Sequence, residues 1–194
     1  MSLAPSPLLA GRFAEALTLT VELHSNQSRK RTPTPYLGHL LGVASLVIDS
    51  GGDEDEVIAA LLHDAVEDQG GKETLERIRS EFGDRVAGIV WACSDTDEVP
   101  KPPWKKRKQD YLDHLESADA STLLVSCADK LHNARSIALD HGDVGPAVWD
   151  RFSASREETL WYYRSLAEVF ERRLPDSQLS AELTAVVARL EALD

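Results

Sequence analysis

Residues 60–71, ALLHDAVEDQGG, place His63 beside Asp64 and Glu67 beside Asp68 in an otherwise apolar segment. Imidazole and carboxylate groups are common ligands of divalent metals and common general acids and bases. On a helix, at 100° per residue, His63, Asp64 and Glu67 fall on one side and Asp68 lies at its edge. The opposite stripe consists of Val57, Ile58, Leu61, Leu62 and Ala65. The polar side borders small alanines rather than Lys and Arg, which is typical of the wall of a site.

His39 and Asp129 could complete a metal site with this pair. His39 is followed at i+4 and i+8 by Val43 and Val47, so it points to the apolar side of its helix. Asp129 lies in LLVSCADKLHNARSIALD, residues 123–140, on the helical face that also carries His132, Asn133 and Ser136. Helical bundles hold metals with such mixed nitrogen and oxygen sets, so the predicted ligands are His39, His63, Asp64 and Asp129. The set suits Mn²⁺, Fe²⁺ or Zn²⁺ without choosing among them, and a buried hydrogen-bond network without metal is the alternative.

The elements that position these side chains are predicted to be helices throughout. Apolar residues recur at spacings of three and four, and no stretch alternates with period two. Prolines and glycines mark the breaks, as in RTPTPYL at 31–37 and LPDS at 174–177. The predicted helices cover 7–26, 36–50, 53–68, 72–82, 84–94, 103–117, 121–140, 147–173 and 177–193, with loops at 94–103 and 141–146. We expect one all-α domain over 1–194, a compact multi-helix bundle with a mononuclear metal site between helices and a core at about 20–170.

Composition limits the class of function. The net charge of −12 argues against general nucleic-acid or membrane-surface binding, which needs a broad basic face. Two basic segments, SRKR at 28–31 and KPPWKKRK at 101–108, could still hold a small polyanion. Neither a secretory signal nor a membrane span is predicted, and the only cysteines, Cys93 and Cys127, stand alone. We therefore expect a cytoplasmic protein with inert thiols and a small-molecule partner.

Four segments carry a resemblance to a known family. They read SRKRTPTPYLGHLLGVASLV, AALLHDAVEDQGG, TLERIRSEFGDRVAGIVWACSDT and CADKLHNARSI. His39, the His63-Asp64 pair and Asp129 resemble the H…HD…D signature of the HD superfamily of metal-dependent phosphohydrolases. The four segments are similar, in order, to the hydrolase domain of RelA/SpoT enzymes and to free-standing small alarmone hydrolases, over about residues 20–170. The resemblance implies an HD-domain enzyme that removes the 3′-pyrophosphate of ppGpp and pppGpp, usually with Mn²⁺, and that lacks the synthetase domain.

The resemblance also implies a role for individual residues. The four predicted metal ligands match those of the family. Glu67 and Asp68 match its acidic pair, which orients or deprotonates the attacking water. Arg29 and Lys30 match the basic pair that packs against the purine. The other implied nucleotide-binding residues are Lys130, Asn133 and Arg135, together with Lys105, Lys106, Arg107 and Lys108 of the basic segment.

One departure leaves the substrate open. Family members often read RKDG-x-PY, whereas this chain reads RKRTPTPY, with Arg31 in place of the acid and no glycine. An HD hydrolase of another nucleotide, such as pppApp or the 2′-phosphate of NADPH, is therefore an alternative. A non-catalytic module that binds an alarmone is a second one, which the intact acidic and imidazole residues argue against. Whether the protein forms a homo-oligomer is also open.

Overall fold

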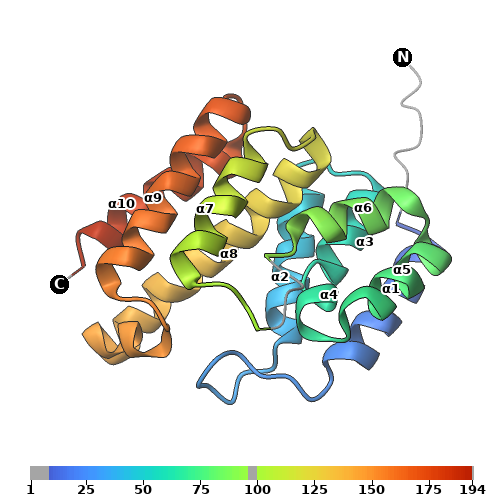
Figure 1. Cartoon of the computed structure of the whole chain (residues 1–194), viewed down its shortest axis with the longest axis horizontal. Helices are drawn as coiled ribbons and strands as arrows, with labels where there is room; N and C mark the ends of the chain where they lie inside the picture. Colours follow the sequence, from blue (N-terminus) through green and yellow to red (C-terminus); the bar gives the residue numbers. More distant parts are fainter. Residues whose placement is uncertain (1–8, 96–99, 194) are drawn as a thin grey trace.

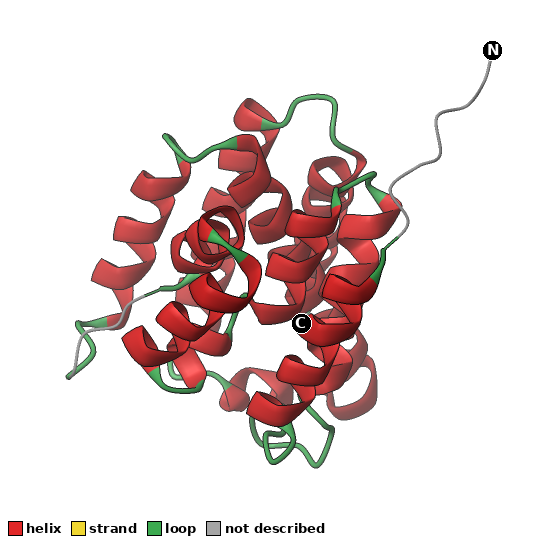
Figure 2. Cartoon of the chain, turned by 90° about the vertical axis from the view of Figure 1, so that its right-hand side faces the viewer, coloured by secondary structure: helices red, strands yellow, loops and turns green. Residues whose placement is uncertain are grey.

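The computed structural model describes residues 9–95 and 100–193, and these residues form helices joined by short loops (Figures 1 and 2). The all-α prediction is confirmed, since the described residues contain no strand beyond one isolated bridge between Ser28 and Pro35. The helices are α1 (Gly11–His24), α2 (Leu37–Asp49), α3 (Glu54–Leu62), α4 (Ala65–Asp68), α5 (Gly71–Phe82), α6 (Asp84–Cys93), α7 (Trp104–Leu115), α8 (Ala120–Val144), the 3₁₀ helix η1 (Gly145–Arg151), α9 (Arg156–Arg173) and α10 (Gln178–Glu191).

Two helices organise the core. α3 is surrounded by α1, α2, α6 and α8, and every residue from Val57 to Leu62 is buried. Asp53 and Glu56 begin it with a capping box, in which each side chain accepts a hydrogen bond from the backbone N–H of the other. α8 runs through the middle of the molecule and separates α9 and α10 from α2 and α3 (Figure 1). Residues on α8 can therefore meet residues from both halves of the bundle.

The predicted continuous helix over 53–68 is wrong. α3 ends at Leu62 and α4 begins at Ala65, so His63 and Asp64 lie in a turn. The ring nitrogen Nδ1 of His63 donates to the carbonyl oxygen of Ala60 at 2.8 Å, which closes the end of α3 with a side chain. His63 and Asp64 both keep right-handed helical dihedral angles, so the break is small, and their side chains lie near His39 of α2 and Asp129 of α8.

The predicted loop over 141–146 and the predicted helix start at 147 are also wrong. α8 continues to Val144 and ends at Gly145, whose φ of +61° suits glycine. A 3₁₀ helix follows, and α9 begins only after Ser155, which forms a capping box with Glu158. The start of the first predicted helix at residue 7 and residues 96–99 of the predicted loop lie outside the described residues. No helix in the described part of the chain is long and apolar enough to cross a membrane.

Phe170 of α9 anchors the α8, α9 and α10 half of the bundle, and its side chain is fully buried. We expect Phe170→Ala to lower the free energy of unfolding by about 3–5 kcal/mol, because it removes buried apolar surface and leaves a cavity. Urea denaturation followed by circular dichroism measures the change. The matched control is Leu139→Ala, since Leu139 is 72% exposed and its loss should change stability little. Equal effects of the two variants would contradict this view of the core.

Candidate metal centre

Four side chains from three places in the fold converge on one point. His39 comes from α2, His63 and Asp64 from the turn before α4, and Asp129 from α8. Nε2 of His39 lies 3.2 Å from Oδ1 of Asp129 and 3.6 Å from Oδ2 of Asp64. Nε2 of His63 lies 3.1 Å from Oδ2 of Asp64 and 3.5 Å from Oδ1 of Asp129. The structure therefore brings the four predicted ligands close together. His39, His63 and Asp129 have ligand atoms that all lie within 4.8 Å of one another, and Asp64 lies beside both imidazoles.

The donor set fits a divalent cation. Ligand atoms at about 2.0–2.2 Å from one ion lie about 3.0–3.6 Å from each other in tetrahedral or octahedral geometry, and the four distances match this range. The Nε2 atoms of His39 and His63 are buried and have no hydrogen-bond partner among the described residues. Buried polar atoms are normally satisfied. A metal ion would satisfy both imidazole nitrogens at once.

The charges around the centre favour ionised carboxylates. Burial alone would raise the pKa of Asp64, but the neighbouring His63 and His39 hold it well below the ordinary value. Burial would also raise the pKa of Asp129, but the adjacent Lys130 holds that pKa well below the ordinary value. Asp64 Oδ2 also accepts a hydrogen bond from the Tyr36 hydroxyl at 2.5 Å. Both carboxylates are thus oriented and charged, as metal ligands must be.

Hydrogen bonds behind the ligands fix their orientation. His63 uses Nδ1 on the Ala60 carbonyl, which directs the Nε2 lone pair into the centre. Nδ1 of His39 lies 3.0 Å from Nδ1 of His132, and burial lowers the pKa of His132 to about 4, so His132 is neutral and can accept. Asp129 accepts from Asn133 at 2.6 Å and from Lys130 at 2.7 Å. Each of these three ligands is therefore held by a neighbour from behind.

Gly42 on α2 makes room for the ring that supports His39. A Cβ atom at this position would lie 2.3 Å from Nε2 of His132. We expect Gly42→Ala to displace His132, turn His39 and weaken the binding of a divalent metal ion by about 10–100-fold, the usual effect of losing such a support. Isothermal titration calorimetry gives the affinity. Gly38→Ala is the control, because it lies on the same helix and its Cβ would meet nothing within 4 Å. Equal affinities in both variants would show that His132 does not position His39.

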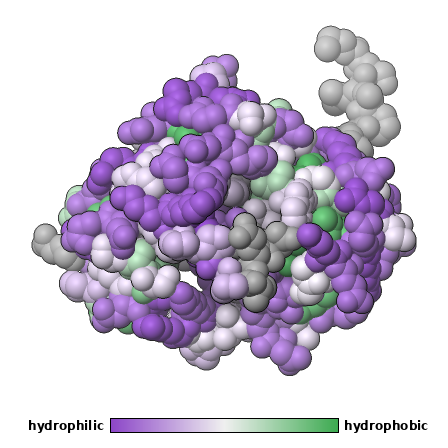
Figure 3. Space-filling model, viewed as in Figure 1, coloured by the Kyte–Doolittle hydropathy of each residue, from purple (hydrophilic) through white to green (hydrophobic). Residues whose placement is uncertain are grey.

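The centre adjoins a cavity of about 470 Å³ that is lined mainly by charged and aromatic side chains. It opens beneath the largely hydrophilic face of the molecule seen in Figure 3. The charged and aromatic residues in its wall are Arg29, Lys30, Tyr36, Glu67, Asp95, Lys101, Trp104, Arg107, Lys108, Lys130, Asp140, Arg151, Phe152, Tyr162 and Tyr163. Seven cations face three acids in this wall, so the cavity reverses the negative field of the chain and suits an anion.

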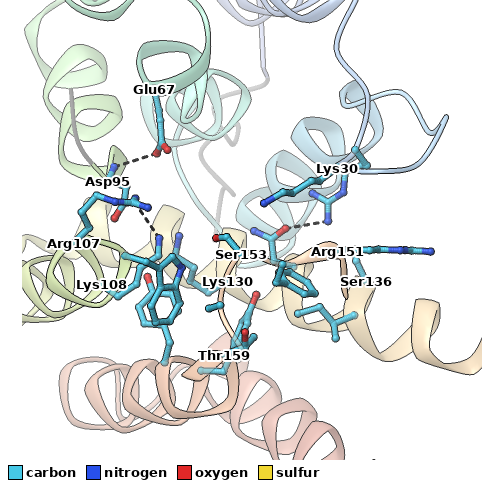
Figure 4. A pocket seen from close by; sticks show the side chains of 18 of the residues that line it. Lys30, Glu67, Asp95, Arg107, Lys108, Lys130, Ser136, Arg151, Ser153 and Thr159 are labelled. Atoms are coloured by element: carbon cyan, nitrogen blue, oxygen red, sulfur yellow. Dashed lines mark hydrogen bonds and ion pairs between the residues drawn. The ribbon is translucent and has the colours of Figure 1, made fainter. Parts of the chain in front are cut away.

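Several cations are held in place by the acids. Lys101 donates to Glu67 at 2.9 Å, and the backbone N–H of Asp95 donates to the same carboxylate at 3.3 Å. Asp95 accepts from Arg107 and, at 3.1 Å, from Lys108 (Figure 4). Burial lowers the pKa of Lys108 to about 7. This part of the wall is a fixed cluster of cations rather than a set of mobile surface lysines.

Seven of the residues predicted to act on water or nucleotide line the cavity, namely Arg29, Lys30, Glu67, Arg107, Lys108, Lys130 and Asn133. Three are engaged elsewhere among the described residues: Lys105 lies over the Trp161 ring at 5.2 Å, Lys106 donates to Asp110 at 2.5 Å, and Arg135 pairs with Glu182 of α10. Helical geometry explains why Lys105 and Lys106 do not reach the cavity: the inner face of α7 carries Arg107 and Lys108, and the two lysines face outward.

Asp68 lies behind Asp64 rather than in the cavity wall. Gln27 donates to its carboxylate at 2.8 Å, and Gln27 in turn accepts from His24 and from Gln69. Burial and the nearby Asp64 raise the pKa of Asp68. The amide of Gln27 therefore fixes the orientation of an acid that neighbours the centre.

Sequence reasoning missed Asp95, Lys101 and Arg151 as parts of the wall. Asp95 and Lys101 lie within the predicted loop over 94–103, and Arg151 lies in the 3₁₀ helix that was predicted to be part of a long α-helix. Periodicity gives no signal for such positions. For Tyr36, the signal was its place in the quoted segment RKRTPTPY, three residues before His39.

An all-helical fold with two imidazoles and two carboxylates, brought together from α2, the turn before α4 and α8, is the arrangement expected of HD-domain proteins. The model of this family, described as an HD domain, matches residues 16–161, and the chain belongs to it. The chain is 38% identical to the guanosine-3′,5′-bis(diphosphate) 3′-pyrophosphohydrolase MESH1 of Xenopus tropicalis over 131 residues, which are 66% of this chain and 70% of the relative. It is 34% identical to the human protein of the same name over the same shares of the two chains.

Solved structures agree in fold. One, described as a metazoan orthologue of SpoT that hydrolyses ppGpp and plays a role in starvation responses, matches with a TM-score of 0.76 and 25% identity over 97% of this chain and 98% of the other. Another, lmo0812 from Listeria monocytogenes, matches with a TM-score of 0.68 and 29% identity over 78% and 97%.

Proposed function

We propose that the protein is a metal-dependent phosphohydrolase that removes the 3′-pyrophosphate from guanosine alarmones, ppGpp and pppGpp. The observation that carries the proposal is the cluster of His39, His63, Asp64 and Asp129 beside a cation-lined cavity, whose wall includes Tyr36, Lys130 and Asn133, the hydrogen-bond partners of the two carboxylates. The names of the relatives and of one solved structure support this substrate. We place the activity in the cytoplasm, which the free and buried thiols of Cys93 and Cys127 support, because disulfides are rare there.

The proposed metal ligands are His39, His63, Asp64 and Asp129. We propose Mn²⁺ as the ion, with Fe²⁺ and Zn²⁺ as alternatives, because two imidazoles and two carboxylates form a mixed donor set. When bound, such an ion lowers the pKa of water and neutralises phosphoryl charge. The chain supplies orientation through Ala60, His132 and Asn133 behind the ligands.

The remaining roles fall to the chain's own acids and bases. Glu67 reaches the cavity and is proposed to accept the proton of the attacking water, while Asp68, fixed by Gln27, orients that water or the ligands. Lys108, Arg107 and Lys130 are proposed to stabilise the charge that develops on the leaving pyrophosphate.

The base and ribose are proposed to lie near the loop before α2. The guanidinium of Arg29 lies 5.8 Å from the centroid of the Tyr36 ring and donates to Asn133 at 3.0 Å, so it is held flat at the cavity edge. A planar cation in this position can stack on a purine. Lys30 lines the same edge. Because Lys105, Lys106 and Arg135 point away from the cavity, we leave them out of the proposed contacts.

The first experiment is to measure pyrophosphate release from ppGpp and pppApp, and phosphate release from NADPH, by metal-stripped protein with Mn²⁺ restored. Rapid Mn²⁺-dependent cleavage of ppGpp is expected. Activity only on pppApp or NADPH would keep the chemistry and change the substrate. No turnover of any of the three, with nucleotide binding retained, would refute the enzyme and favour a nucleotide-binding module.

A further inference from the structure

The cavity extends between α7 and the 3₁₀ helix η1. Arg107 and Lys108 of α7 lie on one side in Figure 4, opposite Lys30, Ser136 and Arg151, so both sides carry cations that suit phosphates. The wall near η1 also includes the aromatic ring of Phe152, which suits a flat base.

One face of α8 connects the metal centre to the wall near η1. Asp129, Asn133, Ser136 and Asp140 follow at i, i+4, i+7 and i+11, so they form a single stripe. At a rise of about 1.5 Å per residue, Asp140 lies about 16 Å along the axis from Asp129. A nucleotide that bound along this stripe with its 3′-phosphate at the metal centre would have its ribose near Asn133 and its base near Ser136 and Asp140.

Asp140 is the acidic side chain at the end of the cavity where the nucleobase would lie. Its side chain is 40% exposed, and its Oδ2 accepts from the Arg151 guanidinium. A carboxylate has about four acceptor sites, so this pairing leaves room for further donors. The ion pair with Arg151 fixes the carboxylate at the cavity wall, where a bound base would meet it.

We propose that Asp140 selects guanosine over adenosine nucleotides, an inference that rests on the proposed function and names its base specificity. Guanine presents two adjacent donors, N1–H and the N2 amino group, on its Watson–Crick edge, and a carboxylate can accept from both. Adenine presents the lone pair of N1 on that edge, which a carboxylate repels. Selectivity thus arises from attraction to one base and repulsion of the other.

The test uses the metal-loaded full chain and two readouts. The first is the ratio of kcat/KM for ppGpp and ppApp in direct competition. The second is the ratio of Kd for GDP and ADP, which have no 3′-pyrophosphate to lose. We expect the wild type to prefer guanosine by at least about tenfold in both ratios. Asp140→Asn should bring each ratio within about threefold of one or reverse it, because an amide offers one donor and one acceptor and matches adenine.

Two further variants test whether the effect of Asp140 is specific to the base or reflects only the loss of a negative charge. Asp143→Asn removes the same charge from an exposed position on α8 and should change neither ratio. Arg151→Met removes the partner that fixes Asp140 and should lower both ratios, but by less than Asp140→Asn does. Equal Kd values for GDP and ADP in the wild type, or unchanged ratios in Asp140→Asn, would each overturn the proposal. A lack of turnover would refute the proposed enzymatic function but not the base selectivity. The ratio of Kd for GDP and ADP tests that selectivity and does not depend on turnover.

Discussion

Asp64→Asn is expected to lower kcat/KM for ppGpp by at least about 10³-fold and to weaken Mn²⁺ binding. Oδ2 of Asp64 lies within 3.6 Å of both buried imidazole nitrogens, so it shares the centre with each. The substitution keeps the size of the side chain and its acceptor for the Tyr36 hydroxyl, but it removes a charge that the ion would neutralise. A loss of several kcal/mol of transition-state stabilisation corresponds to this factor.

Metal content by mass spectrometry and turnover with added Mn²⁺ measure the two effects. Asp49→Asn is the control, because it removes the same charge from an exposed position at the end of α2. Removal of metal from the wild type should abolish turnover, and restored Mn²⁺ should return it. Full activity of Asp64→Asn with normal metal content would exclude Asp64 as a ligand.

The helices that the sequence predicted well are those whose ends carry strong local signals. Gly51, Gly83 and the prolines at 33, 35 and 175 lie next to helix ends, where they act through the backbone: the glycines adopt positive φ and the prolines cannot continue a helix. The break at His63 has no such signal. It is accompanied by a side-chain hydrogen bond from His63 to Ala60 and by the contacts of His63 with Asp64 and Asp129. The contact with Asp129 is tertiary, so the local sequence cannot predict it.

The candidate site shows the same division. His39, His63, Asp64 and Asp129 stand out because ionisable groups are unusual in apolar helices, so their types alone predicted a shared centre. Composition placed many cations in the basic segment, but only the geometry of α7 selects Arg107 and Lys108 for the cavity. Arg151 reaches the cavity from a 3₁₀ helix whose position depends on how α8 ends, and periodicity cannot predict this.

Glu67→Gln is expected to lower kcat by about 10²–10⁴-fold, the usual contribution of a general base. Glu67 lines the cavity, whereas Asp68 is held away from it by Gln27, so Glu67 is the better placed to take a proton. Glutamine keeps the shape of the side chain, but it has one oxygen and keeps only one of the two hydrogen bonds that the carboxylate accepts, from Lys101 or from the Asp95 backbone. Metal binding should be unchanged, because the four ligand atoms lie on other residues.

The separation of kcat from metal affinity distinguishes a base from a ligand. Single-turnover cleavage of ppGpp and Mn²⁺ titration of the same preparation give both quantities, and Glu73→Gln on the exposed first turn of α5 is the control. If Glu67→Gln lost Mn²⁺ and activity together, Glu67 would support the metal rather than move a proton. A kcat within about threefold of the wild type would instead assign the role of proton acceptor to Asp68. Burial and the nearby Asp64 raise the pKa of Asp68.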